Sequence, residues 1–392
     1  MMNTYDWIVV GNGLAGAALS YELANAGFSV VLLEKDTVLD NATRYSYGGI
    51  AYWSGKTDLV RQLCQESVRR YQQLSDELGN DIQFRELDLI LTASIDADPQ
   101  TTLSSYADCA IPPQWIDRHQ ACELEPLLNP EAIAGALTTR HGHVDPESVV
   151  SAYNQAFLRQ NGTIEIATVT GMMRVNDSIK GVITSQGTYE GATVVVCAGG
   201  FSRRLLREAG IQVRQYFTHA ELIETPPISA YLRTLVMPAN LQRFALEAEA
   251  RQPKTDALWD EPDHEIVSPI LDAGAIQFQE GRIRIGQISR ALTNPDEPID
   301  AEQSEAKIRA GIAPILPSLA SLPGQWHHCL VAFSGDGLPL IGAFPGLDGL
   351  HVFSGFNNPF AILPPLARRF VTHSADYPDP IIQQLSPNRL LV

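Results

Sequence analysis

The stretch WIVVGNGLAGAALSYELANAGFSVVLLEK, residues 7–35, decides the fold of this chain. Its apolar residues Trp7–Val10 are typical of a short, fully buried parallel strand. Residues 14–26 are rich in Ala, Leu and Glu and favour a helix, which Gly27 ends. Residues 29–33 form a second apolar run. The order strand, helix, strand predicts a βαβ unit and hence an α/β fold with a parallel sheet.

Three glycines, Gly11, Gly13 and Gly16, stand between the first strand and the helix with the spacing G-x-G-x-x-G. In such units the first glycine allows the tight turn, and the second lets a pyrophosphate approach the backbone. The third lets the helix pack closely on the strand. The free N–H groups at the start of the helix, at Leu14 and Ala15, would face the phosphates. The pattern predicts a dinucleotide-binding site.

An acidic residue, Glu34, closes the second strand 18 residues after Gly16 and is followed by Lys35. At this place a carboxylate accepts hydrogen bonds from a ribose. The acid argues against the 2′-phosphate of NADP, but it leaves NAD and FAD both open. An ordinary βαβ unit with a glycine turn is the alternative, and the complete set of features in the right order favours the nucleotide site.

Length, charge and cysteine content restrict the classes of protein to which the chain can belong. A chain of 392 residues is long enough for two domains, and its net charge of −17 argues against nucleic acid or an anionic membrane as partner. The five cysteines are odd in number and widely spaced, which is typical of a reducing compartment. We see no basic leader before the first strand and no apolar run of the roughly 18 residues that a membrane span needs. We therefore expect a cytoplasmic protein.

Glycine-rich turns recur far from the first one. The stretch VVVCAGG at 194–200 is a second buried strand with a glycine turn, and a third glycine-rich apolar zone covers 334–355. Between them, residues 211–290 alternate like antiparallel strands. This dispersal predicts a discontinuous cofactor domain interrupted by a β-rich substrate domain. The expected boundaries are 1–85, 145–212 and 325–392 for the cofactor domain, and 86–144 and 213–324 for the substrate domain.

Four blocks of the sequence carry a resemblance to a known family. They are GNGLAGAALSYELANAG with VVLLEK, RYSYGGI, GHVDPESVVSAY with TVVVCAGGFS, and SGDGLPLIGAFPGLDGLHVFSGF. With them the chain resembles the D-amino-acid oxidase superfamily of FAD enzymes, which includes glycine oxidase, sarcosine oxidase and D-amino-acid dehydrogenase. The resemblance implies a Rossmann-like, glutathione-reductase-like FAD-binding domain. Into it an α+β substrate domain would be inserted, built on a mixed, largely antiparallel sheet.

The resemblance also implies which residues contact FAD. The first three glycines would hold the pyrophosphate, Glu34 the ribose and Val169 the adenine, while the loop at 43–50 and the last glycine turns would lie beside the flavin. The set implied in this way is Gly11, Gly13, Leu14, Ala15, Gly16, Glu34, Lys35, Thr43, Arg44, Ser46, Tyr47, Gly48, Gly49, Ile50, Val169, Ala198, Gly199, Cys329, Gly335, Asp336, Gly337, Gly355, Phe356, Asn357, Asn358, Pro359 and Phe360.

The chain departs from the family in two places. The family pattern G-H-x-x-x-G is replaced by GFNNPF, in which Phe356 stands for the His and Pro359 lacks a backbone donor. The arginine or lysine that usually binds a substrate carboxylate is also missing, because residues 330–332 and Ala361 occupy its places. A buried carboxylate without a cation is costly. Either another arginine replaces it or the substrate has no α-carboxylate at that position. Arg44 and Arg290 are the candidates, and the alternative for both is that they are surface arginines.

Further candidates surround the expected pocket. Tyr47, Tyr216 and His219 are predicted to border the substrate, with a role in the hydrophobic core as the alternative for Tyr216 and His219. Cys329 falls where sarcosine oxidase carries the cysteine bonded to its flavin, and the alternative is a buried free thiol. We predict no metal site at the run His141 to Asp145, because Asp145 is expected to cap a helix.

The resemblance implies an activity. The chain would oxidise the C–N bond of an amino acid or of a primary or secondary amine by hydride transfer to flavin N5, and water would hydrolyse the imine. The electrons would pass to oxygen or to another acceptor. Three alternatives remain at this point: a flavin dehydrogenase of a hydroxy acid or polyol phosphate, a flavin module that modifies a tRNA base, and a non-catalytic flavoprotein subunit.

Overall fold

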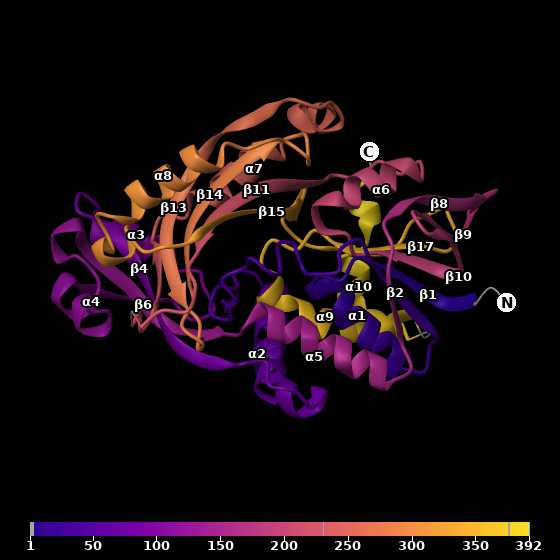
Figure 1. Cartoon of the computed structure of the whole chain (residues 1–392), viewed down its shortest axis with the longest axis horizontal. Coiled ribbons are helices and arrows are strands. Elements are labelled where there is room, and N and C mark those ends of the chain that lie inside the picture. Colours follow the sequence, from indigo (N-terminus) through magenta and orange to yellow (C-terminus); the bar gives the residue numbers. More distant parts are fainter. Residues whose placement is uncertain (1–3, 230, 375–376, 392) are drawn as a thin grey trace.

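The structure is a computed structural model that describes residues 4–229, 231–374 and 377–391. These residues form two sheets, sheet A with eight strands and sheet B with nine. Figure 1 shows sheet A with its helices on the right and the long, curled strands of sheet B on the left. None of the helices in the described parts of the chain has both the length and the apolar character that crossing a bilayer requires.

Sheet A is built from segments that lie far apart in the sequence. Its strands are β1 (Thr4–Val10), β2 (Val30–Glu34), β7 (Thr163–Ile166), β8 (Val169–Val175), β9 (Ser178–Thr184), β10 (Gly187–Val196), β16 (Leu340–Ala343) and β17 (Leu350–Ser354). The central order is β16-β17-β10-β1-β2-β7, in which the strands from β17 to β7 are parallel and β16 is antiparallel to β17. The predicted first βαβ unit is confirmed as β1, α1 (Leu14–Asn25) and β2.

Helices cover both faces of sheet A, as a parallel sheet requires. One face packs on α1, α2 (Asp58–Leu78), α5 (Pro146–Arg159) and α9 (Pro359–Ser374). The other face packs on α6 (Ser202–Glu208) and the β8–β9 hairpin. The side chain of Asp145 caps α5 by accepting the N–H of Ser148, which confirms the predicted cap. The remaining short helix of the C-terminal part is α10 (Pro380–Gln384).

Sheet B is mixed and mostly antiparallel. Its strands are β3 (Gly49–Ile50), β4 (Arg85–Ser94), β5 (Gln114–Asp117), β6 (Ile133–His143), β11 (Gln215–Glu224), β12 (Leu235–Pro238), β13 (Glu265–Gln277), β14 (Ile283–Leu292) and β15 (Gln325–Ser334). They follow the order β15-β11-β14-β13-β12-β4-β6-β3, in which only the β12–β4 pair is parallel among the described strands, and β5 pairs with β6. The two sheets confirm the predicted fold class.

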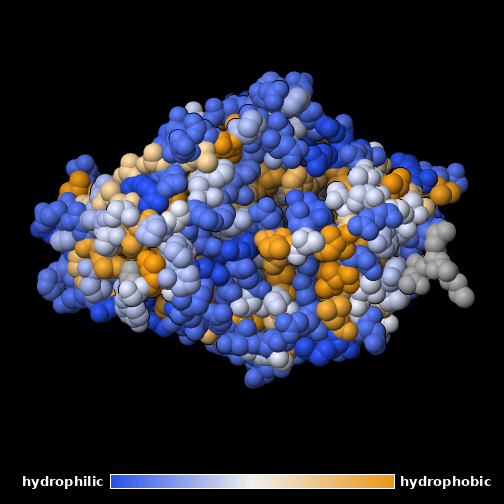
Figure 2. Space-filling model, viewed as in Figure 1, coloured by the Kyte–Doolittle hydropathy of each residue, from blue (hydrophilic) through white to orange (hydrophobic). Residues whose placement is uncertain are grey.

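The helices that accompany sheet B are short. They are α3 (Pro99–Ser104), α4 (Arg118–Leu124), α7 (Gln242–Ala250) and α8 (Ala301–Ile312). The 3₁₀ turns are Pro130–Ala132, Gly199–Phe201, Pro253–Asp260, Pro317–Leu319 and Pro387–Leu390. Apolar side chains of α4 and α8 pack on one face of sheet B and form a single buried cluster with it. Figure 2 shows that hydrophilic side chains cover most of the visible face of the molecule, with apolar ones in small separate patches.

The predicted domain boundary at residue 325 does not coincide with the boundary between sheet A and sheet B. The sequence assigned residues 325–334 to the cofactor domain, whereas β15 pairs with β11 of sheet B along its whole length. The strand is hydrogen-bonded from Gln325 to Ser334, so its backbone belongs with the substrate sheet. We propose that the cofactor domain resumes only after residue 334.

A buried cluster of charges joins the two halves of the molecule. The carboxylate of Glu224, at the end of β11, accepts from Arg44 Nη1 at 2.9 Å, from Arg44 Nη2 at 2.7 Å and from Arg284 Nε at 2.7 Å. Arg282 donates to Asp145 and to Glu147 at the start of α5. Burial alone would raise the pKa of Glu224, but the hydrogen bonds from Arg44 and Arg284 lower it to about 2. The cluster therefore links sheet B to the loop after β2 and to α5.

We expect Glu224→Gln to lower the free energy of unfolding at pH 7 by about 3–5 kcal/mol, because the buried Arg284 loses the carboxylate that its Nε contacts and Arg44 keeps only Glu147. In the wild-type protein this stabilisation is present above the ordinary carboxyl pKa of 4.5 and is lost as the pH falls toward the folded-state pKa of about 2. The difference between the two proteins therefore shrinks in acid, and urea unfolding at pH 7 and pH 3 measures it.

A matched control is Asp88→Asn, which removes the partner of Arg140 in an exposed pair 3.0 Å apart. This change should alter the unfolding free energy by less than about 1 kcal/mol. A loss that small for Glu224→Gln would show that the cluster does not hold the two halves together.

Candidate active site

One continuous cavity of about 680 Å³ lies between the carboxyl ends of the sheet A strands and the concave face of sheet B. In open α/β sheets ligands bind beyond the carboxyl ends of the strands. The cavity reaches from Glu34 at the end of β2 to the turn before α9 and to strands β11, β12 and β15. It therefore has the extended shape that a dinucleotide requires, with further space beside sheet B.

The glycine turn after β1 is shaped for close backbone approach. Gly11 has φ +103°, and a Cβ there would lie 2.8 Å from the carbonyl oxygen of Cys197. A Cβ on Gly16 would overlap the carbonyl oxygen of Gly11, so only glycine lets α1 start this close to β1. No acidic side chain lies in the first turn of α1, which leaves its N-terminus suited to an anion.

The predicted ribose-binding acid is held at the edge of the cavity. Glu34 Oε2 accepts the N–H of Asn12 at 2.7 Å, and Oε1 accepts the N–H of Lys35 at 2.8 Å. The Glu34 residue is 8% exposed and lines the cavity. Both oxygens are thus oriented by backbone donors, and each retains a lone pair for a ligand hydroxyl.

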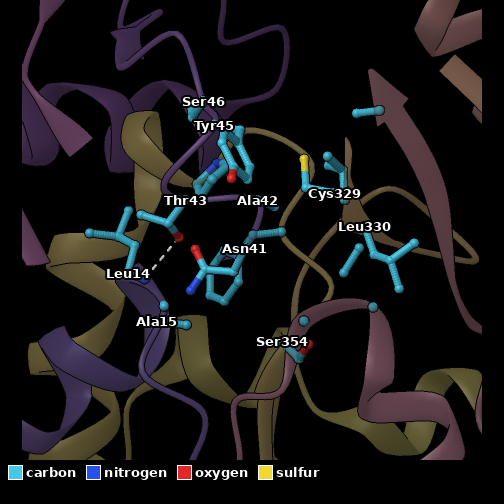
Figure 3. Close-up of a pocket in the computed structure, with 18 of the residues that line it drawn as sticks. Leu14, Ala15, Asn41, Ala42, Thr43, Tyr45, Ser46, Cys329, Leu330 and Ser354 are labelled. Atoms are coloured by element: carbon cyan, nitrogen blue, oxygen red, sulfur yellow. Dashed lines mark hydrogen bonds between the residues drawn. The ribbon is translucent and has the colours of Figure 1, made fainter. Parts of the chain in front are cut away.

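A loop between β2 and β3 crosses the start of α1. Figure 3 shows Thr43 bonded to the N–H of Leu14, and the Oγ1 to N distance is 3.0 Å. In the same view Tyr45 lies across the cavity from Cys329 and Leu330. Asp40, Asn41 and Ala42 also line the cavity but were not predicted, although they directly precede Thr43 in the sequence.

Aromatic and cationic side chains lie near the Glu34 end. The ring of Phe201 lies between Lys35, whose Nζ is 5.4 Å from the ring centroid, and Arg204, whose Cζ is 5.0 Å from it. All three residues line the cavity. Phe201 and Arg204 were missed, although they follow the predicted Gly199 in the stretch AGGFSRR.

The other end of the cavity, which we call the chamber, is walled by the concave face of sheet B, by the loop of Tyr45 and Tyr47 and by the start of α7. Apolar side chains and polar or titratable ones contribute to its walls in equal number. The side chains that form it are Tyr45, Tyr47, His141, Ala220, Leu222, Leu235, Met237, Leu241, Arg243, Phe244, Asp272, Gln287, Cys329 and Val331.

Most residues that the sequence assigned to the cofactor line this cavity. They are Gly11, Gly13, Leu14, Ala15, Glu34, Lys35, Thr43, Ser46, Tyr47, Gly49, Val169, Ala198, Gly199, Cys329, Gly355, Phe356, Asn357, Asn358, Pro359 and Phe360. Those that do not line it are Gly16, Arg44, Gly48, Ile50, Gly335, Asp336 and Gly337. Gly16 instead packs on Gly11, as its predicted role in helix–strand packing requires.

The turn at 335–337 faces away from the cavity, contrary to the expectation that it approaches the flavin. The N–H of Gly335 donates to the carbonyl oxygen of Arg214 at 2.8 Å. Asp336 Oδ2 accepts from Arg389 Nε at 2.7 Å. The turn is thus used to fix the C-terminal segment, while Cys329 and Val331, a few residues earlier on β15, face the chamber.

Neither arginine predicted to bind a carboxylate reaches the chamber. Arg44 is bound to Glu224 and lies 3.0 Å from Glu147, and Arg290 Nε donates to Glu221 Oε1 at 2.6 Å. Both guanidinium groups are mostly buried, so they are not surface arginines either. Each is neutralised by a carboxylate of the protein and does not line the cavity.

Two further predicted residues also lie outside the cavity lining. The hydroxyl of Tyr216 donates to Asp256 Oδ1 at 2.6 Å beneath Trp259. His219 Nδ1 lies 2.7 Å from Nε2 of His328, and burial lowers the pKa of His219 to about 3. Neighbouring side chains on a strand point to opposite faces, so Ala220 rather than His219 lines the cavity. Tyr47 is the predicted catalytic candidate that the chamber contains.

These features define a nucleotide-binding site of the dinucleotide type, and comparison with known proteins identifies its family. Residues 6–371 match the family described as FAD dependent oxidoreductase, DAO. The chain therefore belongs to this family of FAD-dependent oxidoreductases, and its cofactor is FAD.

Individual proteins agree with this assignment. The chain is similar to glycine oxidase of Pseudomonas aeruginosa, with 26% identity over 396 residues that cover 96% of each chain. It is also similar to 4-methylaminobutanoate oxidase (formaldehyde-forming) of Paenarthrobacter nicotinovorans, with 23% identity over 383 residues. That match covers 91% of this chain and 42% of the oxidase, so the chain spans less than half of that relative's length. The crystal structure of glycine oxidase from Geobacillus kaustophilus has the same fold, with a TM-score of 0.80, 21% identity and 99% coverage of both chains.

The cavity fits FAD at both ends. The predicted donor at Leu14 is bonded to Thr43, but Gly13 and Ala15 leave backbone N–H groups for a pyrophosphate, and Glu34 presents its carboxylate to a ribose. At the far end, Gly355 turns the chain with φ +78° into Asn357 and Asn358, which line the cavity before α9 begins. We infer that the residues between these ends hold the cofactor.

We expect Glu34→Gln to weaken FAD binding by about 10-fold or more, because a charge-assisted hydrogen bond to the ribose is lost. Titration of the apoprotein with FAD, followed by flavin fluorescence, measures the change. The exposed neighbour Asp36 provides the control Asp36→Asn, which removes the same charge outside the cavity lining and should leave the affinity unchanged. Equal affinities for all three proteins would contradict the role of Glu34.

We expect FAD to be bound without a covalent link to Cys329. Burial raises the pKa of this thiol to about 12, and only the thiolate attacks a flavin ring. Acid precipitation of the holoprotein should leave all the flavin in the supernatant, and Cys329→Ala should retain the same flavin content. A yellow pellet that loses its colour in Cys329→Ala would show that the bond exists.

Proposed function

We propose that this chain oxidises the carbon–nitrogen bond of an amino acid or of a primary or secondary amine. Membership of the FAD-dependent oxidoreductase family supports the redox chemistry. The names of the relatives, glycine oxidase and 4-methylaminobutanoate oxidase, support a substrate that contains nitrogen. The observation that carries the proposal is the chemistry of two titratable side chains in the chamber, His141 and Asp272.

His141 is a poor proton acceptor. The indole N–H of Trp53 donates to His141 Nδ1 at 3.0 Å, so the neutral imidazole carries its proton on Nε2. Burial lowers the pKa of His141 to about 3, so it does not take up a second proton near neutral pH. Oxidation of an alcohol needs a base that removes the hydroxyl proton, whereas an amine reacts once it is neutral. This state of His141 therefore favours an amine over an alcohol.

Asp272 supplies a carboxylate that suits an ammonium group. Its two oxygens accept the backbone N–H groups of Gln242 at 2.9 Å and Arg243 at 3.1 Å. Burial raises the pKa of Asp272, which brings it closer to that of a bound ammonium. The positive charge of Arg243 acts to lower this pKa and offsets the effect of burial only in part. An amine substrate would provide a further positive charge, and Asp272 is positioned to accept its proton.

The division of work between cofactor and chain follows from this arrangement. FAD supplies the acceptor for the hydride that leaves the substrate. Leu222, Leu235 and Met237 give the chamber apolar walls on its sheet B side. Tyr47 is fixed by its hydroxyl, which donates to the carbonyl oxygen of Gly274 at 3.3 Å, so its ring forms a stable wall.

Anaerobic mixing of the holoprotein with a substrate panel tests the proposal. The panel contains primary amines, N-methylated amines, amino acids, 2-hydroxy acids and glycerol 3-phosphate, and loss of the visible flavin absorbance reports reduction. We expect at least one amine or amino acid to bleach the flavin and the hydroxy compounds to leave it oxidised. Bleaching by a hydroxy acid or by glycerol 3-phosphate alone would overturn the proposal in favour of a dehydrogenase for substrates without nitrogen.

A further inference from the structure

We propose that Arg243, in the first turn of α7, binds a carboxylate of the substrate, so that the chamber selects amines that also carry an acidic group. The inference deepens the proposed function and rests on it, since it assumes that the chamber holds the substrate. Arg243 was not singled out in the sequence, because residues 211–290 were interpreted as alternating strands and α7 interrupts them.

Arg243 is the cation that the chamber holds. Three cationic side chains line the whole cavity among the described residues, namely Lys35, Arg204 and Arg243. The first two flank Phe201 near Glu34, at the end that we assign to the adenosine part of FAD. Arg243 alone of the three lies in the chamber, where Leu241 and Phe244 of the same segment also line the wall.

The guanidinium group of Arg243 has hydrogen-bond donors that no acceptor in the described parts of the protein uses. Nη2 donates to the carbonyl oxygen of Asn357 at 2.8 Å, and Nε lies 3.3 Å from Glu247 Oε1. An arginine carries five N–H donors, and Nη1 has no acceptor among the residues that the structure describes. The side chain is 20% exposed and lines the cavity. A planar edge with unused donors is the group that binds carboxylates in bidentate fashion.

Two acids lie near Arg243, and Asp272 contacts its backbone N–H while Glu247 is the one that contacts its guanidinium group. The Glu247 side chain is 2% exposed. Its burial raises its pKa, although the positive charges of Arg243 and Arg251 act to lower it. A carboxyl group that is reluctant to ionise leaves much of the positive charge of Arg243 for a ligand. The apolar side chains in the walls of the chamber strengthen that attraction, because they screen charges less than water does.

The position of Arg243 also suits an amino acid. Its bond to Asn357 places it beside the turn before α9, where we expect the flavin ring. Its own backbone N–H donates to Asp272, the carboxylate that we propose as the partner of the ammonium group. One wall of the chamber thus presents a cation and an anion side by side. Residues 330–332 and Ala361, which occupy the usual places of the family's carboxylate-binding residues, provide neither.

Ligand binding to the oxidised holoprotein tests the inference. Carboxylates from acetate to phenylacetate are each paired with the corresponding amide, and dissociation constants are measured from the change in the flavin spectrum. We expect Arg243→Met to raise the dissociation constants of the carboxylates about 30-fold or more and those of the amides less than about 3-fold. Arg243→Lys should lie between, since it keeps the charge but loses the bidentate geometry. The control Arg140→Gln removes an exposed charge on β6 and should behave as the wild type.

The outcomes separate this inference from the proposed function. Equal weakening of acids and amides by Arg243→Met, or no carboxylate binding to the wild type, would overturn the role of Arg243. Reduction of the wild-type flavin by amines without a carboxylate, as fast as by amino acids, would overturn it while the amine oxidation stands. Selective loss of carboxylate binding in Arg243→Met, in a protein whose flavin no amine reduces, would support the carboxylate site and reject the amine substrate.

Discussion

The architecture of this molecule depends on a guanidinium group that has no access to water. Arg284 has 0% side-chain exposure, and a buried cation persists only when counter-charges and hydrogen bonds replace its hydration. Glu224 supplies the charge, and the carbonyl oxygen of Ser46 accepts a second hydrogen bond. Because Ser46 belongs to the loop that lines the cavity, the cluster sets the distance between this loop and sheet B. The two sheets face each other across the cavity in one fixed arrangement as a result.

Local sequence was sufficient for the first half of the cavity. The β1–α1–β2 unit, its glycines and Glu34 follow from hydrophobic period and spacing within one short segment, and the structure places them as expected. Contacts between distant segments could not be obtained in this way. Arg44 meets Glu224 across 180 residues of sequence, and Arg290 meets Glu221 across 69. In the sequence each arginine looks available for a ligand, because the acid that neutralises it is visible only once the strands are paired.

Family resemblance identified the fold better than it identified individual contacts. The block around 335–337 matches a family signature, yet its side chains and backbone bind Arg214 and Arg389 instead of lining the cavity. The helix α7, in contrast, was not predicted, although some of its residues line the cavity. The stretch QRFALEAEA contains strong helix formers, and its composition could have indicated a helix inside the region interpreted as strands. A motif specifies the path of the backbone. Which of its groups face a ligand depends on the other segments of the chain that contact it.

The pairing of β10 with both β1 and β17 has a consequence for how the protein is made. On the side opposite β1, β10 pairs through Gly187–Glu190 with β9 and through Val194–Val196 with β17, so its carboxyl-terminal end lacks this second neighbour until residues 350–354 have left the ribosome. Contacts that join such distant residues are slow to form, and an unpaired strand edge is prone to aggregate while it waits. Premature termination before residue 350 would therefore leave Val194–Val196 of β10 unpaired on one side, a natural target for chaperones during synthesis.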